Sequence, residues 1–313
     1  MDDAASSDGA GTDGPASAGR DEPAFALALG GGGARGLAHI HILETLDELG
    51  IRPRVIAGSS IGAIMGAGMA AGMRGADIRA YAGSILGRWG GIARRIWRAR
   101  PGSLSEMMDG GLRLGQFNIE RILGAFLPEE IPAAFEALSI PLKVTATDYF
   151  GSSLAVFETG DLRSALAASA AIPAVFQPVL RDGRLYIDGG IYNPVPFDLV
   201  EGSADIVIAV DVVGAPFDTG RRPTSLDLVL GANQLMMQSI SDHKLRQHPP
   251  HIFLRPPVSA FRALDFLKVE TVLAETEGVR DELKRGKLEA DTARSSLNSV
   301  GARLTPAQVS RSV

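Results

Sequence analysis

Two short segments constrain the fold of this 313-residue chain most, because each pairs an apolar run with a glycine-framed turn. Residues 25–29 lead into the glycine run 30–36, and residues 55–57 lead into the turn 58–62. An apolar run that ends in a tight turn and continues into a helical pattern is typical of a strand–turn–helix unit. Ligand sites of parallel sheets lie beyond the carboxyl ends of the strands, so we expect both turns at one edge of a sheet.

The rest of the chain continues this alternation of apolar runs and helical patterns. It predicts an α/β fold with three layers, in which a mainly parallel central sheet is covered by helices on both faces. Beyond the first two strands, the sequence predicts strands at 142–146, 154–157, 185–187 and 206–212, and helices at 37–49, 61–73, 165–171, 226–241 and 264–288.

Composition limits the class of protein. The chain is 45% hydrophobic and 21% charged, which is ordinary for a globular protein with a sizeable core. It has no cysteine, which excludes disulfides, thiolate metal sites and a cysteine nucleophile. Its net charge of −5 argues against general nucleic-acid binding. No metal-ligand cluster stands out, so we expect no cofactor.

The ends of the chain differ in composition from its centre. Residues 1–23 are acidic and rich in small residues, and they lack the basic start and apolar region of a signal peptide. We expect a disordered tail there, one domain over 24–290, and a polar tail over 291–313. No uncharged apolar run is a good bilayer span, so we expect a cytoplasmic protein.

The second turn carries a candidate nucleophile. Gly58, Ser60 and Gly62 fit the pattern G-x-S-x-G, which presents a serine hydroxyl on a sharp strand-to-helix turn. The start of the following helix would stabilise negative charge at Ser60. The alternative is a small-residue turn in which a serine merely caps the helix.

The glycine run offers backbone N–H groups at a helix start. Its spacing formally fits the dinucleotide fingerprint, but the next predicted strand ends without the expected acidic residue. No Lys-Ser/Thr pair follows, which excludes a phosphate-binding loop of the Walker A type. Two interpretations of the glycine run remain. It is an oxyanion hole, with Arg35 stabilising the loop or the anion, or it only allows a helix to pack closely against a strand. The candidate oxyanion residues are Gly31, Gly32, Gly33, Ala34, Arg35 and Gly36.

A serine nucleophile needs a general base, and the best candidate is Asp188. It ends the apolar run 185–187 and precedes Gly189 and Gly190, which allow another backbone to approach closely. The alternative is a β-turn aspartate, which the Asp-Gly pair also favours. Histidine is a second possibility for the base, since a Ser…Asp…His order is that of an α/β-hydrolase triad. His243, His248 and His251 follow Asp188, and His39 lies one turn into the first helix.

Taken together, the three motifs resemble those of the patatin-like phospholipases. Residues 31–36 match the family motif G-G-G-x-R/K-G, residues 58–62 match G-x-S-x-G, and residues 188–190 match D-G-G/A. The block 168–176 also resembles the family, and matching features run from about residue 25 to residue 212. One departure is His41, where many members carry a small residue, and it puts bulk near the glycine loop.

The resemblance implies a Ser60–Asp188 dyad without histidine. Ser60 would attack an acyl ester carbonyl of a lipid, phospholipid above all, while Asp188 accepts its proton and the glycine loop holds the oxyanion. Water would then release a free fatty acid from the acyl-enzyme. Two alternatives stay open: a non-catalytic lipid-binding protein on the same fold, and an esterase with a Ser-Asp-His triad. The oligomeric state stays open too.

Residues 84–118 predict a lid or a membrane-docking insertion. Within them, residues 87–100 hold both tryptophans, five arginines and no acidic residue, a composition typical of an interfacial helix on anionic lipid. An amphipathic helix packed on the domain fits this composition equally well. If the segment is an interfacial helix, we expect peripheral association at the inner membrane surface through Trp89, Arg94, Arg95, Trp97 and Arg98.

Overall fold

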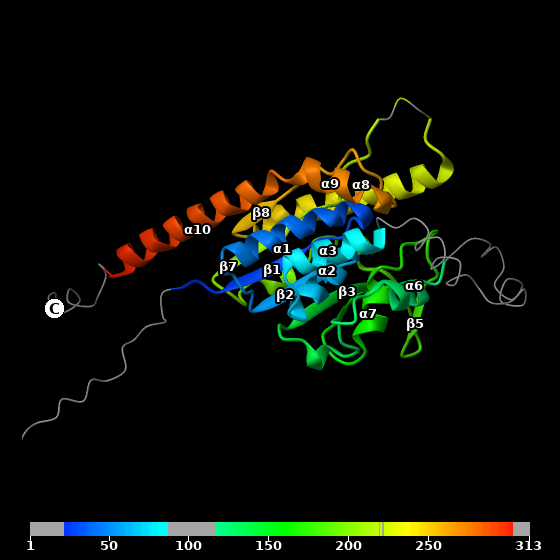
Figure 1. Cartoon of the computed structure of the whole chain (residues 1–313), viewed down its shortest axis with the longest axis horizontal. Helices are drawn as coiled ribbons and strands as arrows, with labels where there is room; N and C mark the ends of the chain where they lie inside the picture. Colours follow the sequence, from blue (N-terminus) through cyan, green and yellow to red (C-terminus); the bar gives the residue numbers. More distant parts are fainter. Residues whose placement is uncertain (1–21, 87–116, 219, 221, 303–313) are drawn as a thin grey trace, which may run out of the picture.

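A central eight-stranded sheet lies between helices in the computed structural model, which describes residues 22–86, 117–218, 220 and 222–302 (Figure 1). The strand order is β5-β6-β3-β2-β1-β7-β8, and β4 pairs with β3 beside this path. The strands are β1 (Phe25–Leu29), β2 (Val55–Ser59), β3 (Leu142–Asp148), β4 (Ser153–Phe157), β5 (Val179–Arg181), β6 (Arg184–Asp188), β7 (Ile206–Val210) and β8 (Ile252–Leu254).

Parallel pairing dominates the centre of the sheet. β1 pairs in parallel with β2 and β7, β2 with β3, and β7 with β8. β4 and β6 run antiparallel to β3, and β5 runs antiparallel to β6. The predicted mainly parallel sheet is therefore confirmed. Because β1, β2 and β3 share one direction, the turns after β1 and β2 emerge at the same edge.

The two faces of the central strands bury side chains of different size. Along β1, Phe25, Leu27 and Leu29 face a large core beneath the helices of one layer. Ala26 and Ala28 face a smaller core, which the segment containing Phe197 and α8 cover. The helices are α1 (His39–Glu48), α2 (Ile61–Ala70), α3 (Gly75–Leu86), α6 (Ile119–Phe126), α7 (Leu162–Ser169), α8 (Ser225–Gln247), α9 (Val269–Thr276) and α10 (Val279–Ala302), with 3₁₀ turns η1 (Gly33–Ala38), η2 (Phe135–Ala137), η3 (Gly189–Ile191), η4 (Phe197–Val200) and η5 (Phe266–Lys268).

The C-terminal part differs from the prediction. The single helix predicted over 264–288 is wrong, because the chain forms η5 and then two helices, α9 and α10, that break at residues 277–278. α10 continues to Ala302, so the predicted domain boundary at residue 291 lies inside a helix. Val279 and Leu283 pack α10 against the core, and further along the helix Lys287 donates to Asp291 one turn on, at 2.6 Å.

The region predicted as an insertion is only partly described. α3 reaches Leu86 and α6 begins at Ile119, so the structure describes residues 84–86 and 117–118 of the range 84–118. Trp89, Arg94, Arg95, Trp97 and Arg98 lie outside the described residues. Within the described ranges, no helix combines the length and apolar character that crossing a bilayer requires.

Candidate active site

Ser60 lies on a strained turn between β2 and α2. Its backbone has φ 52° and ψ −123°, in the region with positive φ that non-glycine residues rarely adopt. Such a conformation costs about 1–3 kcal/mol and persists only where the surroundings impose it. Ser60 is 4% exposed and stands immediately before the first residue of α2, Ile61. The predicted elbow geometry is therefore present.

The two glycines of the elbow allow the turn to lie against its neighbours. A Cβ atom added at Gly62 would lie 2.2 Å from the carbonyl oxygen of Leu29, at the end of β1. One added at Gly58 would lie 2.4 Å from the Cα atom of Ala63. Any side chain at these positions would push α2 away from the sheet, so the residues flanking Ser60 set its position.

The glycine loop lies directly beside Ser60. A Cβ atom added at Gly31 would be 3.2 Å from the Cβ atom of Ser60. Gly31 N–H donates to the Pro194 carbonyl at 2.9 Å, and Ala34 N–H donates to the Ala263 carbonyl at 2.7 Å. These two amides are thus occupied. The Gly32 and Gly33 amides precede or open η1, where helix N–H groups have no intrahelical partner, so these two remain candidates for the predicted oxyanion donors.

Two buried side chains fix the loop from behind. Arg35 Nε donates to the Gly32 carbonyl at 3.1 Å, and its Nη1 donates to the Val213 carbonyl. Burial lowers the pKa of Arg35 to about 10, so the side chain remains a cation at neutral pH. His39 Nε2 donates to the Gly30 carbonyl at 2.8 Å, and complete burial lowers the pKa of His39 to about 4. Of the two roles considered for Arg35, its contacts match loop stabilisation.

Asp188 ends β6, which runs antiparallel to β3, and it pairs with Ala146, the residue after the Thr145 that pairs with Ser59. Its backbone N–H donates to the Ala171 carbonyl at 3.0 Å, and its own carbonyl accepts the Thr147 hydroxyl at 2.9 Å. Its Oδ1 accepts the Gly190 N–H at 2.8 Å. Its buried Oδ2 has no donor among the described residues at hydrogen-bond distance and angle. Burial raises the pKa of Asp188 to about 6, and the nearby Ser60 side chain and the Gly190 amide oppose this shift.

Sequence reasoning gave no role to Ser169, which lies at the end of α7. Its hydroxyl oxygen accepts the Ser60 N–H at 2.8 Å, and the residue is fully buried. The contact joins residues 109 positions apart, so no local pattern could reveal it. Ser169 thereby holds the backbone of the strained elbow.

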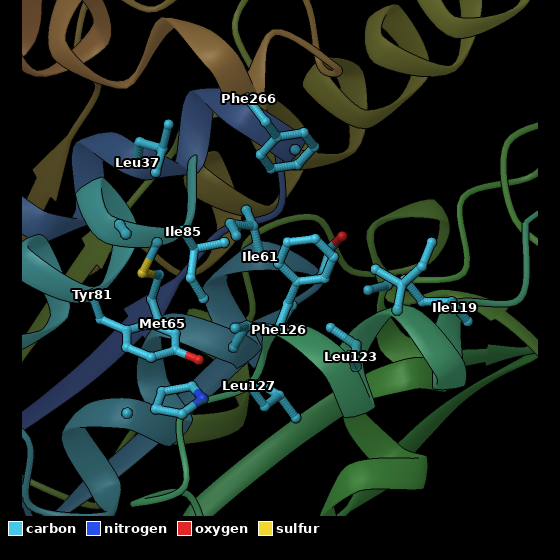
Figure 2. Close-up of a pocket in the computed structure, with 18 of the residues that line it drawn as sticks. Leu37, Ile61, Met65, Tyr81, Ile85, Ile119, Leu123, Phe126, Leu127 and Phe266 are labelled. Atoms are coloured by element: carbon cyan, nitrogen blue, oxygen red, sulfur yellow. The ribbon is translucent and has the colours of Figure 1, made fainter. Parts of the chain in front are cut away.

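An apolar cavity of about 390 Å³ opens from Ser60. Its walls come from α2, α3, α6 and the segments around residues 172–176 and 264–266. Figure 2 shows Leu37 and Phe266 on one side of the cavity and Leu123 and Leu127 on the other. Among its lining residues in the described part of the chain, only Ser60 and Tyr81 carry a polar side chain, and none is charged. The cavity suits a hydrocarbon chain whose polar end lies at Ser60.

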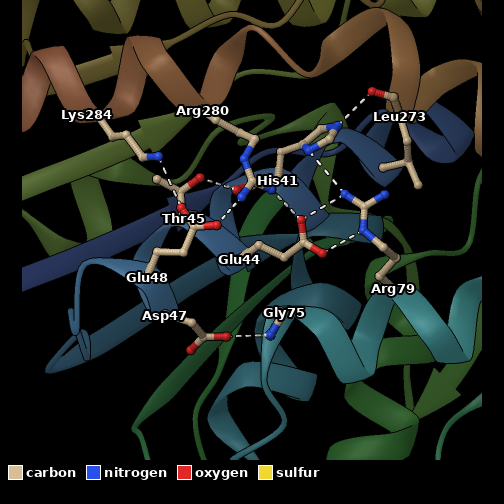
Figure 3. Close-up of polar contacts among 10 residues, drawn as sticks. All are labelled: His41, Glu44, Thr45, Asp47, Glu48, Gly75, Arg79, Leu273, Arg280 and Lys284. Carbon is tan, nitrogen blue, oxygen red and sulfur yellow. Dashed lines mark hydrogen bonds and ion pairs between the residues drawn. The ribbon is translucent and has the colours of Figure 1, made fainter.

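His41 points away from the cavity, contrary to the expectation that it adds bulk near the glycine loop. Its Nε2 lies 2.7 Å from the Leu273 carbonyl of α9, and Arg79 Nη2 of α3 lies 3.3 Å from its Nδ1 (Figure 3). Glu44 of α1 accepts from Arg79 at 2.6 and 2.8 Å and from Arg280 of α10 at 2.6 Å. This cluster ties α3, which walls the cavity, to α1 and α10.

The remaining histidines lie elsewhere in the fold. His248 Nδ1 lies 3.1 Å from the Glu201 carboxylate, and His251 accepts the N–H of Val207 near the amino end of β7. His243 lies on α8. Within the described ranges, no group of three or more His, Cys, Asp or Glu residues is arranged to hold a metal ion.

Comparison with known proteins places the chain in a family. The model of the patatin-like phospholipase family matches residues 27–200, which include the glycine loop, Ser60 and Asp188. The chain belongs to the patatin-like phospholipase family.

Similar proteins of this family are longer than the present chain. An uncharacterised NTE family protein of Mycobacterium tuberculosis is 40% identical over 198 residues, covering 63% of this chain and 51% of that protein. The patatin-like phospholipase domain-containing protein 7 of Mus musculus is 29% identical, with 80% of this chain and 20% of that protein covered. The lysophospholipase nte1 of Aspergillus fumigatus is 25% identical, with coverage of 80% and 17%. The chain thus spans about half the length of the mycobacterial relative.

Proposed function

We propose that this protein is a serine hydrolase that cleaves fatty-acyl esters of membrane lipids, with Ser60 as nucleophile and Asp188 as proton acceptor. The observation that carries the proposal is a strained serine that lines an uncharged cavity of about 390 Å³. A structural serine at a helix start needs neither the strain nor the cavity. The lysophospholipase name of one relative supports phospholipid or lysophospholipid as the substrate class.

In the first half-reaction, the Ser60 hydroxyl gives its proton to Asp188 as its oxygen bonds to the ester carbonyl carbon. The tetrahedral oxyanion lies toward the Gly32 and Gly33 amides and the positive end of α2. The ester bond to the alcohol then breaks, and Asp188 returns the proton to the leaving oxygen. In the second half-reaction, water repeats these steps on the acyl-enzyme and releases the fatty acid.

The environment of Asp188 supports its role as a base. A carboxylate with an ordinary pKa is a weak acceptor for a hydroxyl proton, and burial raises the pKa of Asp188 from 3.8 to about 6. The free Oδ2 leaves a lone pair for the incoming proton. The carboxylate is still mostly ionised at neutral pH, as a base must be.

The test is fatty-acid release from mixed phospholipid vesicles and from a short p-nitrophenyl ester. We expect activity in the wild type and its loss in Ser60→Ala and Asp188→Ala, with the circular dichroism of both variants unchanged. Full activity in Ser60→Ala would refute the mechanism. Absence of activity in the wild type on both substrates would favour a lipid-binding protein instead.

The triad alternative makes a different prediction for histidine. His248→Ala and His251→Ala remove side chains whose contacts lie with Glu201 and Val207. A dyad enzyme keeps its kcat in both variants and in His243→Ala. Loss of kcat by more than about a hundredfold in one folded variant would favour a triad, because removal of a general base has effects of that size.

A further inference from the structure

An apolar face of α8 is exposed. Four large apolar side chains, Leu228, Val229, Leu235 and Met236, are each more than half exposed, at 59%, 56%, 55% and 59%. Their spacing places them on one side of the helix, and we call these four residues the α8 surface. A helix packed on a core normally turns such a face inward.

Polar residues share the inner positions of α8 with Met237, which is 8% exposed. Gln234 donates to the Val213 carbonyl at 3.1 Å, and Ser241 is 1% exposed. Much of the apolar surface of α8 therefore faces outward. Residues 228–240 contain no charged side chain, so moving this half of the helix into an apolar phase requires no charge to lose its water.

The α8 surface lies next to the candidate active site. The Val213 carbonyl that accepts from Gln234 also accepts from Arg35, which holds the Gly32 carbonyl of the glycine loop. Arg262 lies 3.8 Å from Asp227 of α8, and the same segment supplies Leu264, which lines the cavity and is 40% exposed. The first turns of α8 also extend toward the edge of the sheet where β1 and β2 end (Figure 1).

From these observations we propose that the α8 surface docks on the face of an electrically neutral phospholipid layer and brings the cavity mouth to its acyl chains. This proposal rests on the proposed function for its substrate. Two ion pairs lie beside the surface: Arg262 with Asp227, and Lys268 with Asp265 at 2.8 Å. The contact therefore depends on apolar insertion and does not need anionic lipid.

Flotation with phosphatidylcholine vesicles tests the docking directly. All proteins carry Ser60→Ala, so that binding is measured without hydrolysis. Leu235→Gln should weaken vesicle binding about tenfold, which corresponds to about 1.4 kcal/mol of lost insertion energy. The matched control is Leu288→Gln on α10, where a leucine is 68% exposed at a distance from the site in sequence and fold, and it should bind like the parent.

Activity assays separate docking from chemistry. With Ser60 intact, Leu235→Gln should keep its rate on the short soluble ester and lose rate on vesicles in parallel with binding. Unchanged flotation of Leu235→Gln would overturn the proposal, as would binding that requires anionic lipid. A wild-type dimer that this variant converts to a monomer in light scattering would assign the surface to a second copy. If the wild type cleaves neither substrate, the proposed function fails, and flotation still decides the docking.

Discussion

Replacing Asp188 by asparagine should change stability in a manner that depends on pH. Burial raises the pKa of this carboxyl group from 3.8 to about 6, so the folded protein disfavours its ionised form. At about 1.4 kcal/mol per pKa unit, ionisation of Asp188 costs the folded state about 3 kcal/mol at pH 8 and about 1.5 kcal/mol at pH 5. A raised carboxyl pKa gives stability that is full below pH 3.8 and is lost as the pH rises through about 6.

The measurement is urea unfolding of the wild type and Asp188→Asn between pH 5 and pH 8. The free energy of unfolding of the variant relative to the wild type should rise by about 1.5 kcal/mol over that range. Any penalty from burying the new amide is independent of pH and cancels. Asp148→Asn is the control, because Gly151 and Arg184 lower the pKa of Asp148, and both folded and unfolded forms stay ionised over this range. A difference for Asp188→Asn that does not vary with pH would refute the reasoning.

Three further predictions concern the rate, the elbow and the helix cluster. If Asp188 is the base, kcat/KM rises about tenfold per pH unit below about pH 6 and levels off at higher pH. A pH–rate profile on the short ester measures this, and a profile that is flat from pH 5 to 8 would exclude Asp188 as the base. Ser169→Ala leaves the Ser60 N–H without its acceptor and should lower kcat about tenfold with little change in KM, whereas Ser164→Ala on the same helix should have no effect in the same kinetic assay. Glu44→Gln removes the carboxylate that both Arg79 and Arg280 contact. It should reduce the free energy of unfolding, measured in urea, by about 2 kcal/mol. A loss below about 0.5 kcal/mol would mean that water already screens these ion pairs.

The sequence predicted the parts of the fold whose signals are local. The apolar runs of β1, β2, β3, β4, β6 and β7 are each bounded by turn residues, and each forms a strand near its predicted range. β5 and β8 have three residues each, too few to show a pattern. Pairing with a neighbouring strand defines each of them, and for β8 that neighbour is β7, which lies more than forty residues earlier in the chain.

Helix boundaries were harder to predict for a physical reason. The break at residues 277–278 separates two helices whose apolar positions together resemble one long periodic run. The extension of α10 past residue 291 rests on pairs such as Lys287 with Asp291, which an apolar period does not report. Hydrophobic periodicity alone therefore places neither the break between α9 and α10 nor the C-terminal end of α10.

The motifs located the three loops of the candidate site but not the residues that hold them. Ser169 supports Ser60 from α7, and Lys244 of α8 contacts Asn193, Asp198 and, at 3.1 Å, the Val195 carbonyl. That segment also presents the Pro194 carbonyl to Gly31. Such supports act across long sequence separations, so they become visible only when the chain is folded.

The cost of building this edge of the sheet is itself an argument about its role. Six buried side-chain polar atoms have no hydrogen-bond partner among the described residues, and three of them belong to His39, Ser59 and Asp188. Ser60 adds backbone strain at the same place. Buried polar groups are normally satisfied, and a turn that served packing alone would have no reason to gather these penalties. Ser60, which carries the backbone strain, lines the apolar cavity, and this combination favours chemistry at Ser60 over mere binding of lipid.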